Sequence, residues 1–173
     1  LNVAVEDLVT EADSITFCLS KGLSAPVGSV ICGNEKFIYH ARRNRKALGG
    51  GMRQAGIIAA AGIVSLDKMI DQIQEDHNNT QLISEGISNI EGLSVDRVNI
   101  KSNILYFDIE KGTNRSLELA KQTTDKYQYP FDIKLDNIYF LETSSSRFRL
   151  VTHYGIIRKD VERILKVLGG MVN

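Results

Sequence analysis

Residues 16–26 read Thr-Phe-Cys-Leu-Ser-Lys-Gly-Leu-Ser-Ala-Pro, an apolar stretch that runs directly into a loop of small residues carrying one lysine. The β-branched and aromatic residues of 13–19 predict a buried strand. Gly and Pro favour a loop over 20–26, and a second strand is predicted over 27–32. Lys21 is the candidate nucleophile here, because a desolvated lysine, or one near other cations, attacks carbonyl groups. The alternative is an ordinary solvated charge at a strand end.

A second candidate segment surrounds Gly49-Gly50-Gly51, which ends a basic helix predicted over 35–48. Lys46 and Arg53 flank the three glycines. Glycines let backbone N–H groups approach an anion, and flanking cations favour its binding. The alternative is a solvated basic face that ends in a flexible helix cap. Three further arginines of this helix are assigned to the surface or to an interface: Arg42, Arg43 and Arg45.

The remaining pattern predicts alternating helices and strands. The predicted helices span 52–64, 66–90, 115–127 and 160–168, and Gly169-Gly170 are expected to end the last one. The predicted strands span 94–99, 104–109, 131–134, 138–142 and 147–154. The helix over 52–64 is rich in Ala, Gly and Ile, which predicts tight packing. From residue 92 onward the pattern is that of a small α+β layer.

Arg149 is the candidate group for binding a carboxylate. In a strand over 147–154, alternation places Arg149, Val151 and His153 on one face. Phe148, Leu150 and Thr152 lie on the other face. The planar guanidinium fork is the preferred partner of a carboxylate. A plain surface arginine is the alternative, and Arg147 is a competitor for the same role.

The composition is that of an ordinary globular protein. The 173 residues carry 21 Lys+Arg and 21 Asp+Glu, and 43% of them are hydrophobic. A net charge of zero argues against a nucleic-acid partner, and no apolar run is long enough to cross a membrane. The two cysteines, Cys18 and Cys32, suit a reduced cytoplasmic chain rather than a disulfide scaffold. The three histidines lack the spacing of a metal site, so no metal is expected.

Several of these segments together resemble one enzyme family. Residues 16–29 look like the cofactor-lysine segment of the low-specificity L-threonine aldolases, which are pyridoxal-phosphate (PLP) enzymes of the aspartate-aminotransferase fold. Residues 40–56 look like the glycine loop of that family, and residues 149–153 match its C-terminal arginine strand. Residues 75–77 and 102–107 are similar to later family segments. The resemblance covers most of the chain in order.

The resemblance implies a role for each candidate residue. Lys21 would form the Schiff base with pyridoxal 5'-phosphate, with Ser20 hydrogen-bonding nearby. Arg53 would contact the cofactor. Arg149 and Lys46 would bind the amino-acid substrate, Arg149 through the α-carboxylate.

The resemblance also implies an α/β fold in two parts. Residues 1–70 would be the end of the large PLP-binding domain, and residues 71–173 a small C-terminal α+β domain. The family's acidic segment and glycine-rich phosphate turn lie upstream of the cofactor lysine. Neither occurs between Leu1 and Lys21. The chain is therefore expected to be part of a longer protein, or to lack an N-terminal half.

The implied activity is cleavage of L-threonine or allo-threonine, as β-hydroxy-α-amino acids, to glycine and an aldehyde. One alternative is a serine-hydroxymethyltransferase-like or β-eliminating PLP enzyme. Another is a truncated or split subunit without activity alone. The partners implied are a small amino-acid substrate and further copies of the chain in a cytoplasmic dimer or tetramer.

Overall fold

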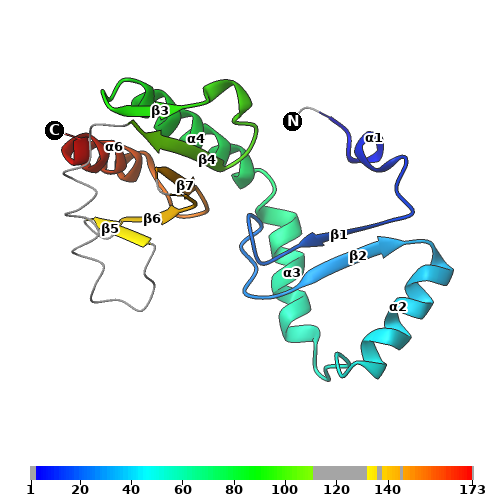
Figure 1. Cartoon of the computed structure of the whole chain (residues 1–173). Coiled ribbons are helices and arrows are strands. Elements are labelled where there is room, and N and C mark those ends of the chain that lie inside the picture. The colour runs from blue at the N-terminus through cyan, green and yellow to red at the C-terminus, as the bar shows by residue number, and fades with distance from the viewer. Residues whose placement is uncertain (1–2, 111–131, 136–137, 145, 173) are drawn as a thin grey trace. The chain divides into compact units, whose positions relative to one another are not determined.

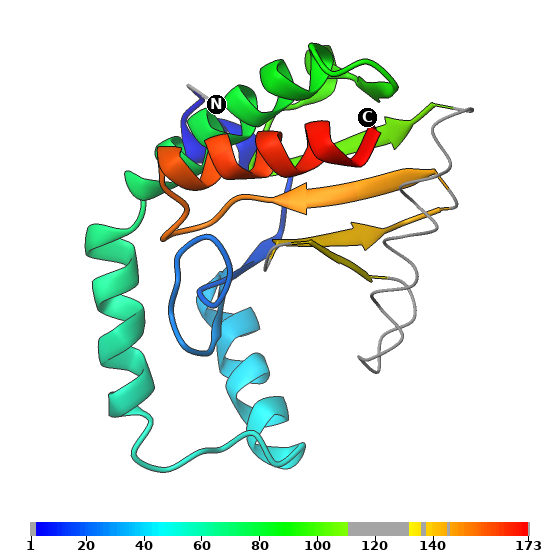
Figure 2. The same ribbon diagram turned by 90° about the vertical axis from the view of Figure 1, so that its left-hand side faces the viewer.

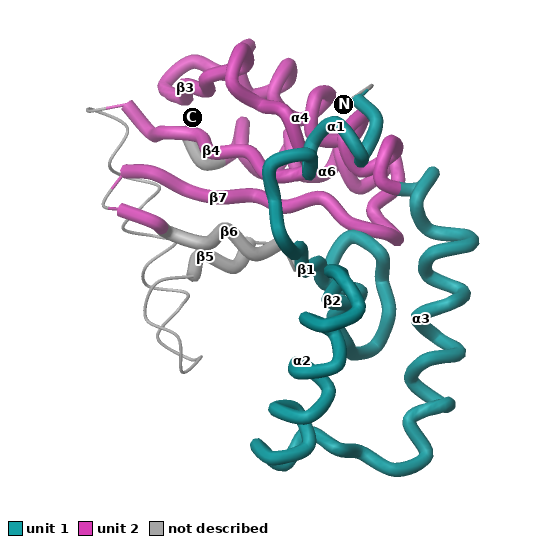
Figure 3. Tube along the Cα trace, turned by 90° about the vertical axis from the view of Figure 1, so that its right-hand side faces the viewer, with its two compact units in different colours: residues 1–72 teal, residues 73–173 magenta. Residues whose placement is uncertain are grey.

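The structure is a computed structural model that describes residues 3–110, 132–135, 138–144 and 146–172. The chain divides into two compact units, residues 1–72 and residues 73–173 (Figure 3). Each unit is described by itself below.

Unit 1 contains a two-stranded sheet and three helices (Figure 1). Its elements in chain order are α1 (Val5–Val9), β1 (Ser14–Cys18), β2 (Ser29–Gly33), α2 (Glu35–Ala47) and α3 (Gly56–Lys68). Strands β1 and β2 pair antiparallel, with Ser14 opposite Gly33 and Cys18 opposite Ser29. The strands predicted over 13–19 and 27–32 and the helix predicted over 35–48 are confirmed, but the burial predicted for the first strand is not, because no residue of β1 is fully buried.

Helix α3 differs from its prediction in both position and packing. It begins at Gly56, four residues after the predicted start. Only Gly62 and Ser65 of this helix are buried, and Ile57 is 81% exposed. Tight packing is therefore found only at Gly62 and Ser65, where the absence of a side chain on Gly62 allows Leu19 to approach. The other residues of this helix are not buried, so the expectation of tight packing is wrong for most of it.

In the described part of unit 2, a five-stranded antiparallel sheet carries two helices on one face (Figure 2). Its helices are α4 (Gln72–Ser88), which begins at the last residue of unit 1, the 3-10 turn η1 (Arg97–Asn99) and α6 (Arg158–Val172). Its strands are β3 (Leu93–Val95), β4 (Ile104–Ile109), β5 (Asp132–Leu135), β6 (Ile138–Glu142) and β7 (Arg147–Val151). The sheet order is β3-β4-β7-β6-β5.

The core of unit 2 lies between the sheet and the two helices. Leu105, Phe107 and Ile109 alternate into it from β4, and Phe148 and Leu150 from β7. The rings of Phe107 and Phe148 stack with centroids 5.5 Å apart. The helices add Ile83, Ile87, Val161, Ile164 and Leu168. The alternation predicted for 147–154 is confirmed as far as β7 extends, and it leaves Arg149 on the face opposite the helices.

Several element boundaries differ from the sequence-based expectations. The single helix predicted over 66–90 is two helices, because α3 ends at Lys68 and α4 begins at Gln72. The strand predicted over 94–99 stops at Val95 and is followed by η1. Helix α6 continues through Gly169 and Gly170 to Val172. The helix predicted over 115–127 lies outside the described residues.

Candidate active site

Lys21 lies in the loop that joins β1 to β2, and backbone hydrogen bonds close this loop at its base. The N–H of Leu19 donates to the Gly28 carbonyl over 2.9 Å, and the N–H of Ala25 donates to the Leu19 carbonyl over 2.9 Å. The N–H of Ser24 donates to the carbonyl of Lys21 itself over 2.8 Å. These bonds define the conformation of the backbone that carries the lysine.

Burial alternates along the loop and fixes which side chains face solvent. Leu19, Leu23 and Ala25 are buried, whereas Ser20 and Lys21 are exposed. A Cβ atom built on Gly62 of α3 would lie only 3.0 Å from Cδ1 of Leu19. The apolar side of the loop therefore lies against α3, and the side chain of Lys21 is exposed to solvent.

The glycine-rich segment is a helix C-terminus with a defined geometry. Gly49 has φ +87°, its N–H donates to the carbonyl of Lys46, and the Gly50 N–H donates to that of Arg45. This pair of bonds is a Schellman motif, in which a glycine in the left-handed region closes the helix. A Cβ atom on Gly51 would lie 3.1 Å from Nζ of Lys46, so the Lys46 side chain folds back over the glycines.

Within unit 1 the structure separates the candidate residues into two groups. Ser20 and Lys21 share the β1–β2 loop. Lys46 and Arg53 lie at the junction between α2 and α3, at another end of the unit in both views (Figures 1 and 2). Lys46 and Arg53 are exposed. The structure does not bring them to the Lys21 loop of the same chain.

In unit 2, two arginines lie two residues apart on β7 with different surroundings. Arg147 donates from Nε and Nη2 to the carboxylate of Asp108, with distances of 3.0 and 2.9 Å. Hydrogen bonding to Asp108 and its negative charge raise the pKa of Arg147. Arg149 is half-buried, and its buried Nε has no hydrogen-bond partner among the described residues. Among the described residues, Arg147 is therefore paired with a carboxylate, whereas the Nε of Arg149 is not.

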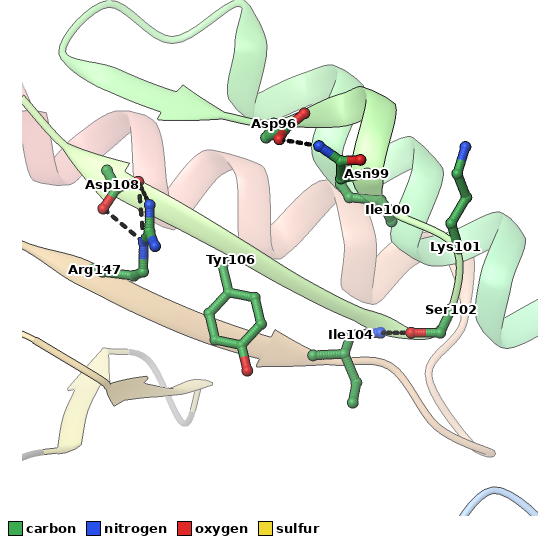
Figure 4. A pocket seen from close by; sticks show the side chains of 9 residues that line it. All are labelled: Asp96, Asn99, Ile100, Lys101, Ser102, Ile104, Tyr106, Asp108 and Arg147. Carbon is green, nitrogen blue, oxygen red and sulfur yellow. Dashed lines mark hydrogen bonds and ion pairs between the residues drawn. The ribbon is translucent and has the colours of Figure 1, made fainter.

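A pocket of about 450 Å³ lies on unit 2, between the exposed face of the sheet and the segment after β3 (Figure 4). It is lined by Asp96, Asn99, Ile100, Lys101, Ser102, Ile104, Tyr106, Asp108 and Arg147. The side chain of Asn99 donates to Asp96, and this bond lowers the pKa of the Asp96 carboxyl. None of the candidate residues lines this pocket except the competitor Arg147.

Sequence reasoning missed Asp108, the residue that distinguishes the two arginines. Alternation along 104–109 could have placed Asp108 on the exposed face of its strand. The register that sets Asp108 opposite Arg147 and Tyr106 opposite Arg149 comes only from the structure. Among the described residues no group of His, Cys, Asp or Glu side chains could hold a metal ion. No described helix is long and apolar enough to span a membrane.

A family model described as beta-eliminating lyase matches residues 1–110. This range includes the Lys21 loop, the glycine-rich segment and unit 2 as far as the end of β4. The chain belongs to the beta-eliminating lyase family. The "Low-specificity L-threonine aldolase 1" of Arabidopsis thaliana is 38% identical to it over 165 residues, which are 95% of this chain and 44% of that protein. This lyase-family chain therefore spans less than half the length of the curated relatives that it matches.

Solved structures show the fold of this member of the family. A protein of Listeria monocytogenes EGD-E described as an L-allo-threonine aldolase superposes with a TM-score of 0.72 at 16% identity, over 98% of this chain and 47% of that one. A structure of SPT with PLP superposes with a TM-score of 0.64 at 12% identity, over 92% of this chain and 39% of that one. At these identities the likeness concerns the fold, which is the expected α/β fold in partial form.

Proposed function

We propose that the protein carrying this chain is a PLP-dependent aldehyde lyase that cleaves L-threonine and allo-threonine to glycine and an aldehyde. The observation that supports it best is the outward-facing Lys21 on a loop anchored to α3, within a chain 38% identical to a low-specificity L-threonine aldolase. In the reaction the Cα–Cβ bond of the substrate breaks, the β-hydroxyl loses its proton and Cα gains one.

The residues of unit 1 fit part of a PLP site. The Lys21 amine would hold the cofactor, and the neighbouring Ser20 hydroxyl offers a hydrogen-bond donor beside it. PLP, when bound, supplies a sink for the electron pair that carbon–carbon cleavage leaves on Cα. Residues that would hold the pyridine nitrogen and the phosphate are not identified in this chain, so we assign them to the remainder of the protein.

The other candidate residues would bind the anionic groups. Arg149 would bind the substrate α-carboxylate, because its buried Nε has no partner among the described residues, whereas the guanidinium of Arg147 is paired with Asp108. Arg53 would contact the cofactor and Lys46 the substrate. Because both lie apart from the Lys21 loop of their own chain, we assign them to the site of a second copy in a cytoplasmic dimer or tetramer.

The domain assignment belongs to the same proposal. Residues 1–70 would be the end of a large PLP-binding domain and residues 71–173 a small C-terminal domain. The incomplete cofactor site supports this assignment, since a finished site needs groups from outside the chain.

The test is Lys21→Ala in the whole protein, with threonine cleavage and visible absorbance as readouts. We expect glycine formation to fall to background and the absorbance of the lysine-bound cofactor to disappear, because no other amine occupies the loop. Lys36→Ala, at an exposed lysine of α2, is the matched control and should keep both. Normal cleavage by Lys21→Ala would refute the proposal.

A β-eliminating activity is the second candidate, favoured by the description of the matching family model. In that case Lys21 and Arg149 would keep their roles, and the substrate would lose a leaving group from Cβ instead of an aldehyde. Products separate the two: threonine, allo-threonine and serine should yield glycine under the first proposal, and ammonia with a keto acid under the second. A serine-hydroxymethyltransferase-like enzyme would favour serine for glycine release.

A further inference from the structure

A cluster of buried polar groups lies in unit 2 beneath the residue that follows β7. Helix α4 contributes Asp76, Asn79 and Thr80, which are 1%, 1% and 0% exposed, and Thr152 is 2% exposed. Asn103, just before β4, completes the cluster. We call Asn103, Thr80 and Thr152, with the backbone carbonyl of Asp76, the Thr152 clamp.

Asn103 forms hydrogen bonds with both the N–H and the carbonyl group of Thr152. Its N–H donates to the Asn103 carbonyl over 3.0 Å, and its carbonyl accepts from Nδ2 of Asn103 over 2.6 Å. This exchange continues the β4–β7 ladder one residue past the pair Ile104 and Val151. Asn103 therefore fixes the end of β7 relative to β4 through its side chain as well as its backbone.

The Thr152 hydroxyl ties the same point to α4. Its Oγ1 donates to the Asp76 carbonyl over 2.6 Å and lies 2.7 Å from Oγ1 of Thr80. The Thr80 hydroxyl also lies 2.9 Å from the Asp76 carbonyl. Two hydroxyl protons serve these three contacts, and both hydroxyls reach the one Asp76 carbonyl, so Thr152 and Thr80 share a single acceptor on α4.

The segment after Thr152 is held by α4 a second time. Nδ2 of Asn79 donates to the Ile156 carbonyl over 2.9 Å. His153 and Tyr154, between these two anchors, are exposed. Nδ1 of His153 lies 2.8 Å from the Tyr154 carbonyl.

Arg149 depends on this backbone for its position. Its Nε has no hydrogen-bond partner among the described residues, so no partner at that atom holds the guanidinium in place. Arg149 lies three residues before Thr152 on the same strand, and its register neighbour is Tyr106 of β4. The contacts that hold β7 against β4 and α4 therefore also determine the position of the Arg149 backbone, from which the side chain extends.

We propose that Thr152, Thr80 and Asn103 are positioning residues that aim Arg149 at the carboxylate of an amino-acid substrate. The inference rests on the proposed function for the identity of that carboxylate, but the geometry of the clamp stands independently. A misplacement of a binding group by about 1 Å is enough to change catalysis about a hundredfold, so a polar clamp on this strand has a measurable consequence.

The first test compares Thr152→Val with Thr152→Ser in the whole protein. Valine keeps the shape and removes the hydroxyl, and serine restores it. We expect Thr152→Val to raise the KM for threonine about tenfold, with a smaller change in kcat, and Thr152→Ser to return it to within about twofold. Thr143→Val is the matched control, since the Thr143 hydroxyl also binds a backbone carbonyl, that of Arg147, at the exposed start of β7.

A second variant covers the case in which Thr152→Val does not fold. Asn103→Ala removes the bond to the Thr152 carbonyl at a half-buried position and should raise the same KM. Binding of an amino alcohol, which lacks the carboxylate, should change little in either variant. If the variants lower the melting temperature but leave the KM for threonine unchanged, the clamp is structural only and the proposal is wrong.

An NMR measurement on the whole protein separates this proposal from the proposed function. The Nε–H resonance of Arg149 should be sharp and exchange slowly in wild type and Thr152→Ser, and it should broaden in Thr152→Val. If the whole protein does not cleave threonine but this pattern appears, the proposed function fails and the positioning role stands. An unchanged resonance in Thr152→Val overturns the positioning role whatever the activity.

Discussion

Two arginines of β7 differ in what their guanidinium groups meet. Arg147 places a bidentate fork on Asp108, whereas the buried Nε of Arg149 has no hydrogen-bond partner among the described residues. A buried donor without an acceptor costs about 1–3 kcal/mol. That cost is reasonable at a binding site, where a ligand carboxylate can engage the same guanidinium.

Exchanging each arginine for lysine tests this distinction. Lysine keeps the charge and loses the planar fork. Arg149→Lys should raise the KM for threonine at least about tenfold, because one bidentate, charge-assisted contact is lost. Arg147→Lys disturbs an exposed ion pair and should leave the KM within about twofold. Steady-state kinetics on the whole protein decide, and the reverse pattern would transfer the carboxylate-binding role to Arg147.

At the residue scale, the sequence predicted on which face of its strand a residue lies, but not which residues of other elements it contacts. Alternation along 147–154 correctly separated Arg149 from Phe148 and Leu150, because a strand has a period of two. The pairing of Asp108 with Arg147 depends on the register between two strands, and these residues are 39 positions apart in the chain, a separation that local patterns do not span. The Thr152 clamp was missed for the same reason, since α4 and β7 meet only in the folded unit.

At the element scale, α2 and most strands were predicted closely, whereas the strand over 94–99 and the ends of the other helices were not. Asn34 caps α2 by accepting the N–H of Phe37, and Gly49 closes it. Gly169 and Gly170 look like the same stop signal but lie inside α6, because a glycine ends a helix only where the chain turns into the left-handed region. Neither Gly169 nor Gly170 has a positive φ.

A pair of glycine substitutions tests how closely α4 and α6 pack. A Cβ atom on Gly86 of α4 would lie 2.3 Å from both methyl carbons of Leu165 on α6. Gly86→Ala gains about 1 kcal/mol of helix propensity but forces Leu165 to move, which costs about 1–3 kcal/mol. We expect net destabilisation in denaturant unfolding.

Gly170→Ala is the control for that pair. Gly170 lies in α6, and nothing lies within 4 Å of an added Cβ atom. This variant should gain up to about 1 kcal/mol in the free energy of unfolding. Stabilisation by both substitutions would show that the two helices do not approach as closely as described.

At the scale of the whole molecule, burial is distributed unequally between the units. Among the hydrophobic residues that the structure describes as buried, only Leu19, Leu23 and Ala25 belong to unit 1. The other twelve form one cluster within unit 2. The composition could not predict this difference, because the 43% of hydrophobic residues is a value for the whole chain. It does not distinguish the hydrophobic residues of the unit 2 sheet, which are buried under helices, from those of α3, which are mostly not buried.

The unequal cores predict that the two units fold differently when separated. Residues 73–173 carry the complete cluster, so they should give dispersed amide resonances and a cooperative thermal transition on their own. Residues 1–72 should not, because three buried apolar side chains cannot offset the conformational entropy of so many ordered residues. Leu105→Ala in the longer fragment should lower its stability by about 2–5 kcal/mol, which verifies that the transition reports this core.

A cooperative transition in residues 1–72 would mean that unit 1 is stabilised by more than its buried side chains. A disordered 73–173 fragment would mean that the sheet depends on residues before Ile73.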